Sequence, residues 1–176
     1  MSPVHVHLLL NHVPILGVLF GSLVLLYGVL RRRDDGVRIG LATLVLAALV
    51  AVPVYLTGEG AEEAVEGLPG VSEALIGEHE EAAEAGFIGT GVLGVLAALA
   101  LVAGRRGSPR VGPLRWTVAA GGLVAFGWLA YVGSQGGQIR HTEIRGDFGA
   151  GDAPQSEDAL VSPGRASNEE AYRDND

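Results

Sequence analysis

Residues Leu8–Arg38 read LLLNHVPILGVLFGSLVLLYGVLRRRDDGVR, and this stretch decides the fold. Its first part, from Leu8 to Leu30, is an apolar run without Asp, Glu, Lys or Arg, and three consecutive arginines follow it. A helix needs roughly 20 apolar residues to cross the hydrocarbon core of a bilayer. The run therefore predicts a membrane-spanning helix, and arginines at its end predict that this end faces the cytoplasm.

Three further stretches of the chain have the same apolar character. They are Val37–Thr57, Ala85–Ala103 and Leu114–Val132. We expect an all-α integral membrane four-helix bundle over residues 1–145, placed in the inner (cytoplasmic) membrane of a bacterium. A buried helical core in a soluble protein is the alternative, but four such segments would leave almost no polar surface.

The charged residues of the connecting segments set the expected orientation. Both the first and the third connection carry four arginines, which are Arg31, Arg32, Arg33 and Arg38, and Arg105, Arg106, Arg110 and Arg115. The second connection, residues 58–84, has nine Glu and no basic residue, and its spacing predicts a helical outer loop. We therefore expect the N-terminus, this loop and the C-terminus on the outer side. The acidic, Gly/Pro/Ser-rich tail at 146–176 is expected to order only on a partner.

Composition excludes several classes of function. The chain has no Cys, which rules out thiolate metal sites, iron–sulfur clusters and covalent haem attachment. The formal net charge is −8, whereas binding to nucleic acid requires a basic face. We expect no nucleic-acid partner.

All five histidines fall on the predicted outer side of the membrane. His5, His7 and His12 lie at the outer end of the first span, His79 lies just before the third, and His141 follows the fourth. Imidazoles from different helices of a bundle are the axial ligands that a b-type haem requires. We expect His12 and His79 to ligate the iron, and His7 with His141 to form a reserve pair for a second haem, a quinone or a metal.

Small residues accompany these histidines. Gly17 and Gly21 form G-x-x-x-G in the first span, and Gly86 continues the stripe that begins at His79. Such a stripe leaves room for a flat macrocycle, and we interpret these glycines as part of the cofactor site. Close packing of helices is the commoner use of small residues. Histidines at the water interface that bond to one another or to headgroups are the corresponding alternative for the imidazoles.

The histidine pattern resembles that of a family of four-span bacterial membrane proteins classed as a domain of unknown function. Its members carry an H-x4-H-[FV]-P-I motif in span 1, a His ahead of span 3, and a Gly-Gly pair before a final His. The matching residues here are His7, His12–Ile15 (HVPI), His79 in GEHEEAA, Gly136, Gly137 and His141. The resemblance covers about residues 5–145, and it implies a histidine pattern like that of bis-histidine membrane cytochromes.

Two functions follow from these observations. The first is a membrane-embedded b-type haem protein that transfers electrons near the outer (periplasmic) face, to or from other membrane subunits or a periplasmic redox partner. The second is a cofactor-free accessory subunit that acts as a scaffold in a larger respiratory or photosynthetic complex. Neither function requires catalytic activity of the chain's own. A transporter is disfavoured because the spans have few polar residues at the bilayer midplane.

Overall fold

The computed structural model describes residues 3–141 and 144–145, and its regular elements are all helices. These are α1 (Pro3–Leu10), α2 (His12–Leu30), α3 (Asp34–Leu56), α4 (Gly58–Glu62), α5 (Glu73–Arg105) and α6 (Val111–Arg140). The described residues contain no strand. The tail that we predict to be disordered, 146–176, lies outside them.

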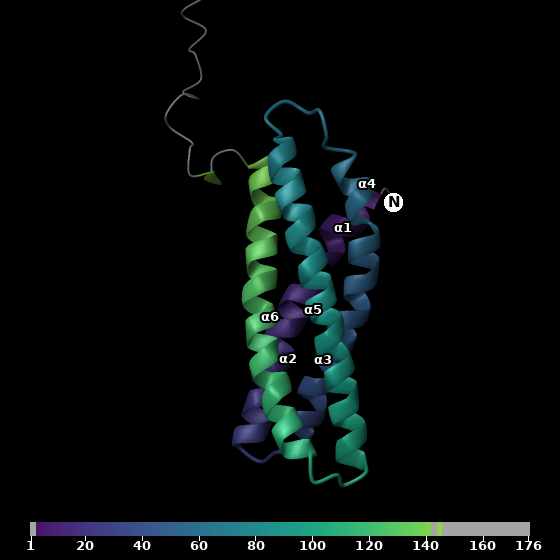
Figure 1. Cartoon of the computed structure of the whole chain (residues 1–176), viewed down its shortest axis with the longest axis vertical. Coiled ribbons are helices and arrows are strands. Elements are labelled where there is room, and N and C mark those ends of the chain that lie inside the picture. The colour runs from purple at the N-terminus through teal and green to yellow at the C-terminus, as the bar shows by residue number, and fades with distance from the viewer. Residues whose placement is uncertain (1–2, 142–143, 146–176) are drawn as a thin grey trace, which may run out of the picture. The chain divides into compact units, whose positions relative to one another are not determined.

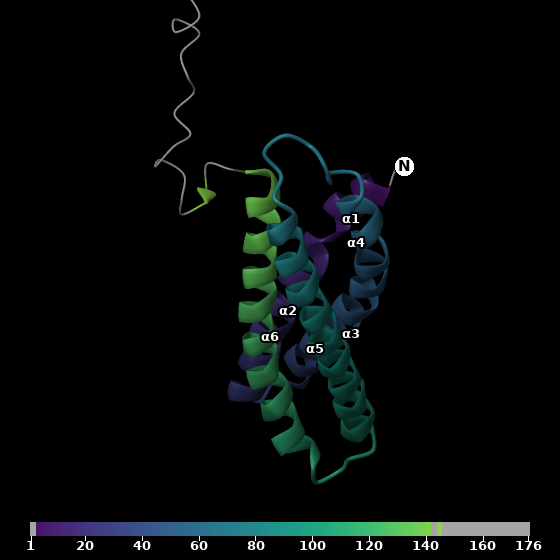
Figure 2. The ribbon, with the colours of Figure 1, turned by 45° about the horizontal axis from the view of Figure 1, so that its top comes forward.

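Four long helices form an antiparallel bundle within residues 3–141. The pairs that pack together are α2 with α3, α3 with α5, α5 with α6, and α6 with α2 (Figure 1). Each helix therefore has two neighbours, and α2 and α5 occupy opposite corners. The short helices α1 and α4 pack against each other at one end, as the tilted view shows (Figure 2).

The surface of the bundle confirms that the four apolar stretches are candidate spans. By length and composition, four helices can cross a membrane: Val4–Leu30, Asp34–Leu56, Glu73–Arg105 and Val111–Ile139. Large apolar side chains on each of them face outward, among them Phe20, Leu49, Val95 and Val124. These faces are compatible with a lipid bilayer and indicate a multi-pass membrane protein. The two arginine-rich connections lie at one end and the Glu-rich connection at the other (Figure 1).

The first span is two helices that meet at Asn11. Its helical part begins at Pro3, as expected from a proline in a first turn. The proline at position 14 has no N–H to donate to the carbonyl of Leu10, and its ring crowds that carbonyl. The two helices therefore join at Asn11, whose backbone stays in the helical region (φ −58°, ψ −31°) and whose N–H donates to the carbonyl of His7 over 2.9 Å.

The third and fourth helices extend beyond the apolar stretches that predict them. α5 begins at Glu73, in the Glu-rich connection, and α6 continues to Arg140. Ala and Glu favour helix even where the segment is too polar to sit in lipid. The first turns of α5, which precede its apolar stretch, carry His79. They place this histidine beside α6.

The contact between α2 and α3 depends on glycine. A Cβ on Gly28 would overlap the backbone of Val37, and one on Gly40 would overlap the backbone of Leu25. Leu25, Leu41 and Leu44 are fully buried beside this crossing. The absence of side chains at these glycines therefore permits the close helix approach that shapes the core.

Candidate functional site

A cavity lies inside the end of the bundle that α1 and α4 cover. Its volume is about 100 Å³, and residues from α1, α2, α3, α5 and α6 line it together with Asn11. The lining combines a histidine, an aromatic pair and several small residues: His7, Tyr55, Phe87, Ala51, Ala83, Gly86 and Gly133. All four bundle helices contribute, as is usual for cofactor sites in bundles.

His7 reaches this cavity from α1 and is fixed by a backbone carbonyl. Its Nδ1 lies 3.0 Å from the carbonyl oxygen of Val54. Val54 is in the last turn of α3, and its carbonyl oxygen also accepts from the N–H and the Oγ1 hydroxyl of Thr57. A carbonyl oxygen only accepts, so Nδ1 carries the proton and donates. In the neutral imidazole with this tautomer, Nε2 carries the lone pair that could bind a metal.

His79 is held in the same way on the opposite side of the bundle axis. Its Nδ1 lies 3.2 Å from the carbonyl oxygen of Val132 on α6, so it also donates from Nδ1. Gly136, one turn further along α6, makes the approach possible. A Cβ there would lie 3.0 Å from Cε1 of His79, which is closer than ordinary van der Waals contact. The imidazole thus lies over a glycine of α6.

Of the two imidazoles, only that of His7 lines the cavity. Both side chains are half-buried, and they are close enough to interact electrostatically. His79 itself is one turn before Ala83, which does line the cavity. His7 is on α1, which leads into α2, and α2 is at the corner of the bundle opposite α5. In the neutral tautomer that donates from Nδ1, each ring keeps Nε2 as the atom that could bind a metal. This arrangement orients imidazoles for metal or haem ligation.

Two polar atoms near the cavity are buried without a partner among the described residues. They are Oγ1 of Thr90 and Oδ1 of Asn11, and both residues line the cavity. Thr90 is 1% exposed, so water outside the protein does not satisfy it. Buried polar atoms normally have a hydrogen-bond partner, and these two therefore favour an occupant that is at least partly polar.

Aromatic side chains complete the walls of this region. Tyr55 and Phe87 stack across α3 and α5 with their ring centroids 4.4 Å apart. On α6, Nε1 of Trp128 donates to the carbonyl oxygen of Ala82 over 2.9 Å, which ties α6 to α5 below His79. The sequence analysis did not identify these residues. Thr90 was detectable, since it extends the stripe of His79, Ala83 and Gly86 by one turn.

The remaining predicted site residues lie elsewhere or have packing roles. His12 is exposed at the start of α2 and does not line the cavity, and His141 is exposed at the end of α6. Gly86 lines the cavity and also packs against Trp128. Gly17 and Gly21 instead receive side chains of α3, with Ala47 and Leu44 each 3.0 Å from the position of an added Cβ. Of the predicted histidines, the structure thus places only His7 in the cavity lining.

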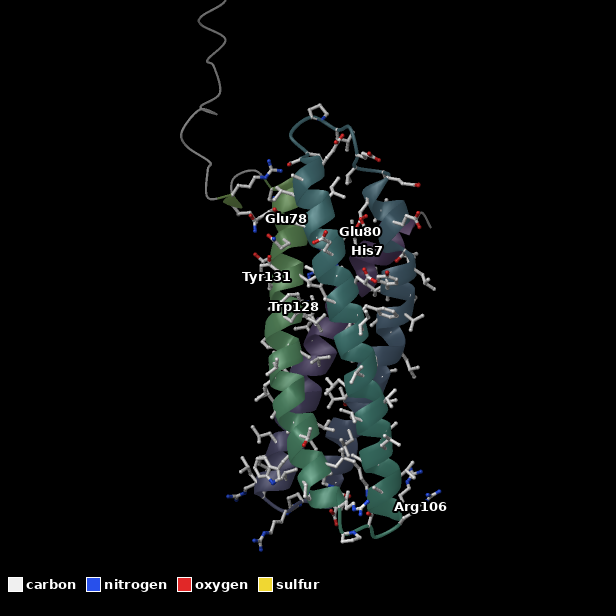
Figure 3. All side chains as sticks on the ribbon, in the orientation of Figure 1. His7, Glu78, Glu80, Arg106, Trp128 and Tyr131 are labelled. Carbon is white, nitrogen blue, oxygen red and sulfur yellow. The ribbon has the colours of Figure 1, made fainter. Side chains whose placement is uncertain are left out.

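Carboxylates gather at the α4 end of the bundle, on α4 and in the first turns of α5. Burial raises the pKa of Glu62 above its ordinary value of 4.5, and the charges of Glu80 and Glu59 raise it further. Figure 3 labels Glu80 and His7 at the α4 end of the bundle and Arg106 at the far end. In the described part of the chain, no three His, Asp or Glu side chains form a group suited to a metal ion.

The comparisons with known proteins add no family to this geometry. No model of a known protein family, no curated protein and no solved structure matches the chain. The site must therefore be interpreted from its own residues.

Proposed function

We propose that the protein binds a b-type haem through His7 and His79 and transfers electrons near the outer face of a bacterial inner membrane. The observation that supports this best is the matched pair of imidazoles, each held at Nδ1 by a backbone carbonyl. When bound, a bis-histidine haem supplies reversible one-electron chemistry. His12, which the sequence favours as a ligand, is exposed and is replaced by His7 in this proposal.

The chain's own residues fit such a group in their chemistry. The carbonyl groups of Val54 and Val132 fix the tautomer of each imidazole and raise its basicity. The stacked rings of Tyr55 and Phe87 provide an apolar wall, and the small side chains of Ala83 and Gly86 leave the α5 wall smooth. An apolar surround limits access of water to the iron and so influences its potential.

The volume of the cavity places a condition on binding. About 100 Å³ is well below the roughly 300–1,000 Å³ of sites for larger ligands. A porphyrin therefore enters only if α1 moves away from its neighbours. Such a movement would require the span to bend at Asn11, where α1 joins α2 and where Pro14 leaves the carbonyl of Leu10 without its helical donor.

The proposal is tested by measuring haem per chain in purified protein. Wild type and His12→Ala should bind the same amount, whereas the double variant His7→Ala/His79→Ala should bind none. His12→Ala is the matched control, since it removes an imidazole from the same segment. Full occupancy in the double variant would rule out this pair of ligands.

Two other outcomes would redirect the assignment. Loss of haem in His12→Ala alone would restore the pair predicted from the sequence. Wild-type protein that carries no chromophore, and that purifies with partner subunits in fixed ratio, would favour the cofactor-free accessory subunit.

A further inference from the structure

A second cavity lies at the opposite, arginine-rich end of the bundle, between α3, α5 and α6. Its volume is about 330 Å³, which is within the range of sites that bind small ligands. Three arginines and one aspartate line it, namely Arg38, Arg105, Arg115 and Asp34, so its charged lining has a net charge of +2. None of these residues takes part in the histidine site, and they are separated from it by the length of the bundle.

Arg115 is the centre of this cleft. Its side chain is only 23% exposed, and its Nε is buried without an acceptor among the described residues. Its Nη1 lies 3.6 Å from Oδ1 of Asp34, which is an ion pair but too long for a hydrogen bond. A buried guanidinium N–H without an acceptor is unfavourable. An anion in the cleft would satisfy it.

The shape of the cleft explains why the guanidinium stays inside the bundle. Gly104 on α5 lies against it, and an added Cβ there would be 3.1 Å from Nη2 of Arg115. Beneath the charged groups, the buried residues Leu41 and Ala100 form an apolar floor. Arg38 and Arg105 are exposed at the rim. A cationic rim over an apolar floor, at the end of a membrane bundle, suits a molecule with an anionic head and an apolar body.

We propose that this cleft binds the phosphate group of an anionic phospholipid from the leaflet on the arginine-rich side. Arg115 and Arg38 would contact the phosphate oxygens, because guanidinium groups bind phosphate through paired N–H donors. Asp34, the one carboxylate in the lining, opposes the anion. The acyl chains would leave the cleft along the outward apolar faces of the spans. A free phosphate ion has the same oxygen acceptors as the phospholipid headgroup but lacks the acyl chains.

The test is a binding titration with purified protein in a neutral detergent. Dissociation constants are measured for phosphatidylglycerol, for phosphatidylcholine and for sodium phosphate alone. Wild type should bind phosphatidylglycerol most tightly. Arg115→Gln and Arg38→Gln should each weaken this binding about fivefold, as expected for one basic residue near an anionic headgroup. Asp34→Asn should strengthen it.

Arg106→Gln is the matched control, since Arg106 is an exposed arginine at the same end that does not line the cleft (Figure 3). It should leave the dissociation constant within about twofold of wild type, because the lost charge is screened by salt. Equal weakening by Arg106→Gln and Arg115→Gln would overturn the site in favour of general surface attraction. Weaker binding in Asp34→Asn would overturn it as well.

The remaining arms separate the sources of the phosphate. If sodium phosphate binds as tightly as phosphatidylglycerol, the proposal of a lipid ligand is wrong and the cleft is a site for a free anion. Phosphatidylcholine that binds as tightly would overturn the requirement for net negative charge. If Arg115→Gln does not fold, Arg38→Gln and Asp34→Asn still decide the question, because both side chains are exposed.

Discussion

Replacement of Gly136 by alanine tests how His79 is held. The added Cβ would lie 3.0 Å from Cε1 of the imidazole, so the ring must move by a few tenths of an ångström. The bond from Nδ1 to the Val132 carbonyl is already 3.2 Å long, at the outer limit for N–H···O, and moving the ring breaks it. Gly127→Ala is the matched control on the same helix, since an added Cβ there meets nothing within 4 Å.

The magnitude follows from the difference between these two variants. Alanine favours helix over glycine by about 1 kcal/mol, and this gain is common to both and cancels. What remains for Gly136→Ala is overpacking, about 1–3 kcal/mol, and a lost hydrogen bond, about 0.5–1.5 kcal/mol, which together lower the unfolding free energy by about 1.5–4.5 kcal/mol. Unfolding by sodium dodecyl sulfate in mixed micelles, followed by tryptophan fluorescence, measures the difference. If the two alanine variants are equally stable, the contact between His79 and α6 is not as described.

Three further changes probe the fold and its outer end. Gly40→Ala should lower the unfolding free energy by about 1–3 kcal/mol in the same assay, because the added Cβ would overlap the backbone of Leu25. A variant as stable as wild type would contradict the close crossing of α2 and α3. Trp128→Phe removes the donor to the Ala82 carbonyl and should cost about 0.5–1.5 kcal/mol, measured likewise, and an unchanged value would contradict that bond. The raised pKa of Glu62 favours the protonated, folded form, so its contribution to stability is present below pH 4.5 and is lost as pH rises through the higher folded pKa. The protection factors of the α4 amides, which are corrected for the base-catalysed intrinsic exchange rate, should therefore fall above that pH in wild type but not in Glu62→Gln. Identical pH profiles of the protection factors would contradict the shift.

The sequence predicts the candidate spans well because a helix in lipid needs a long run of apolar residues, and such a run is visible in the sequence itself. An apolar run such as Leu8–Leu30 is long enough to cross a bilayer wherever its neighbours lie. The ends of the helices were harder to predict. Residues 73–84 are too polar for lipid but favour helix, so α5 begins well before the apolar region.

The surroundings of the histidines depend on tertiary packing more than on sequence. The apolar runs predict that the histidines lie near the ends of the spans, but they do not predict which of them lines a cavity. In the structure His12 is exposed, whereas His7 lies at the cavity. The carbonyl partners are backbone groups of Val54 and Val132, which carry no residue-specific pattern in the sequence. Their role depends on tertiary packing.

The arginine-rich cleft illustrates a second limit. From the sequence, Arg38 and Arg115 predict only the side of the membrane on which their loops lie. Their convergence on one cavity depends on how α3, α5 and α6 meet. Spacing along the chain does not contain that information.

The most direct test of the central claim is an absorption spectrum of His7→Gly in the presence and absence of free imidazole. Wild type should show a Soret band, and dithionite should produce a reduced α-band. If His7 is an axial ligand, the variant should lose this spectrum and regain it when imidazole fills the space left by the side chain. A variant whose spectrum equals that of wild type without added imidazole, or a wild-type protein with no Soret band after haem is supplied, would contradict the account.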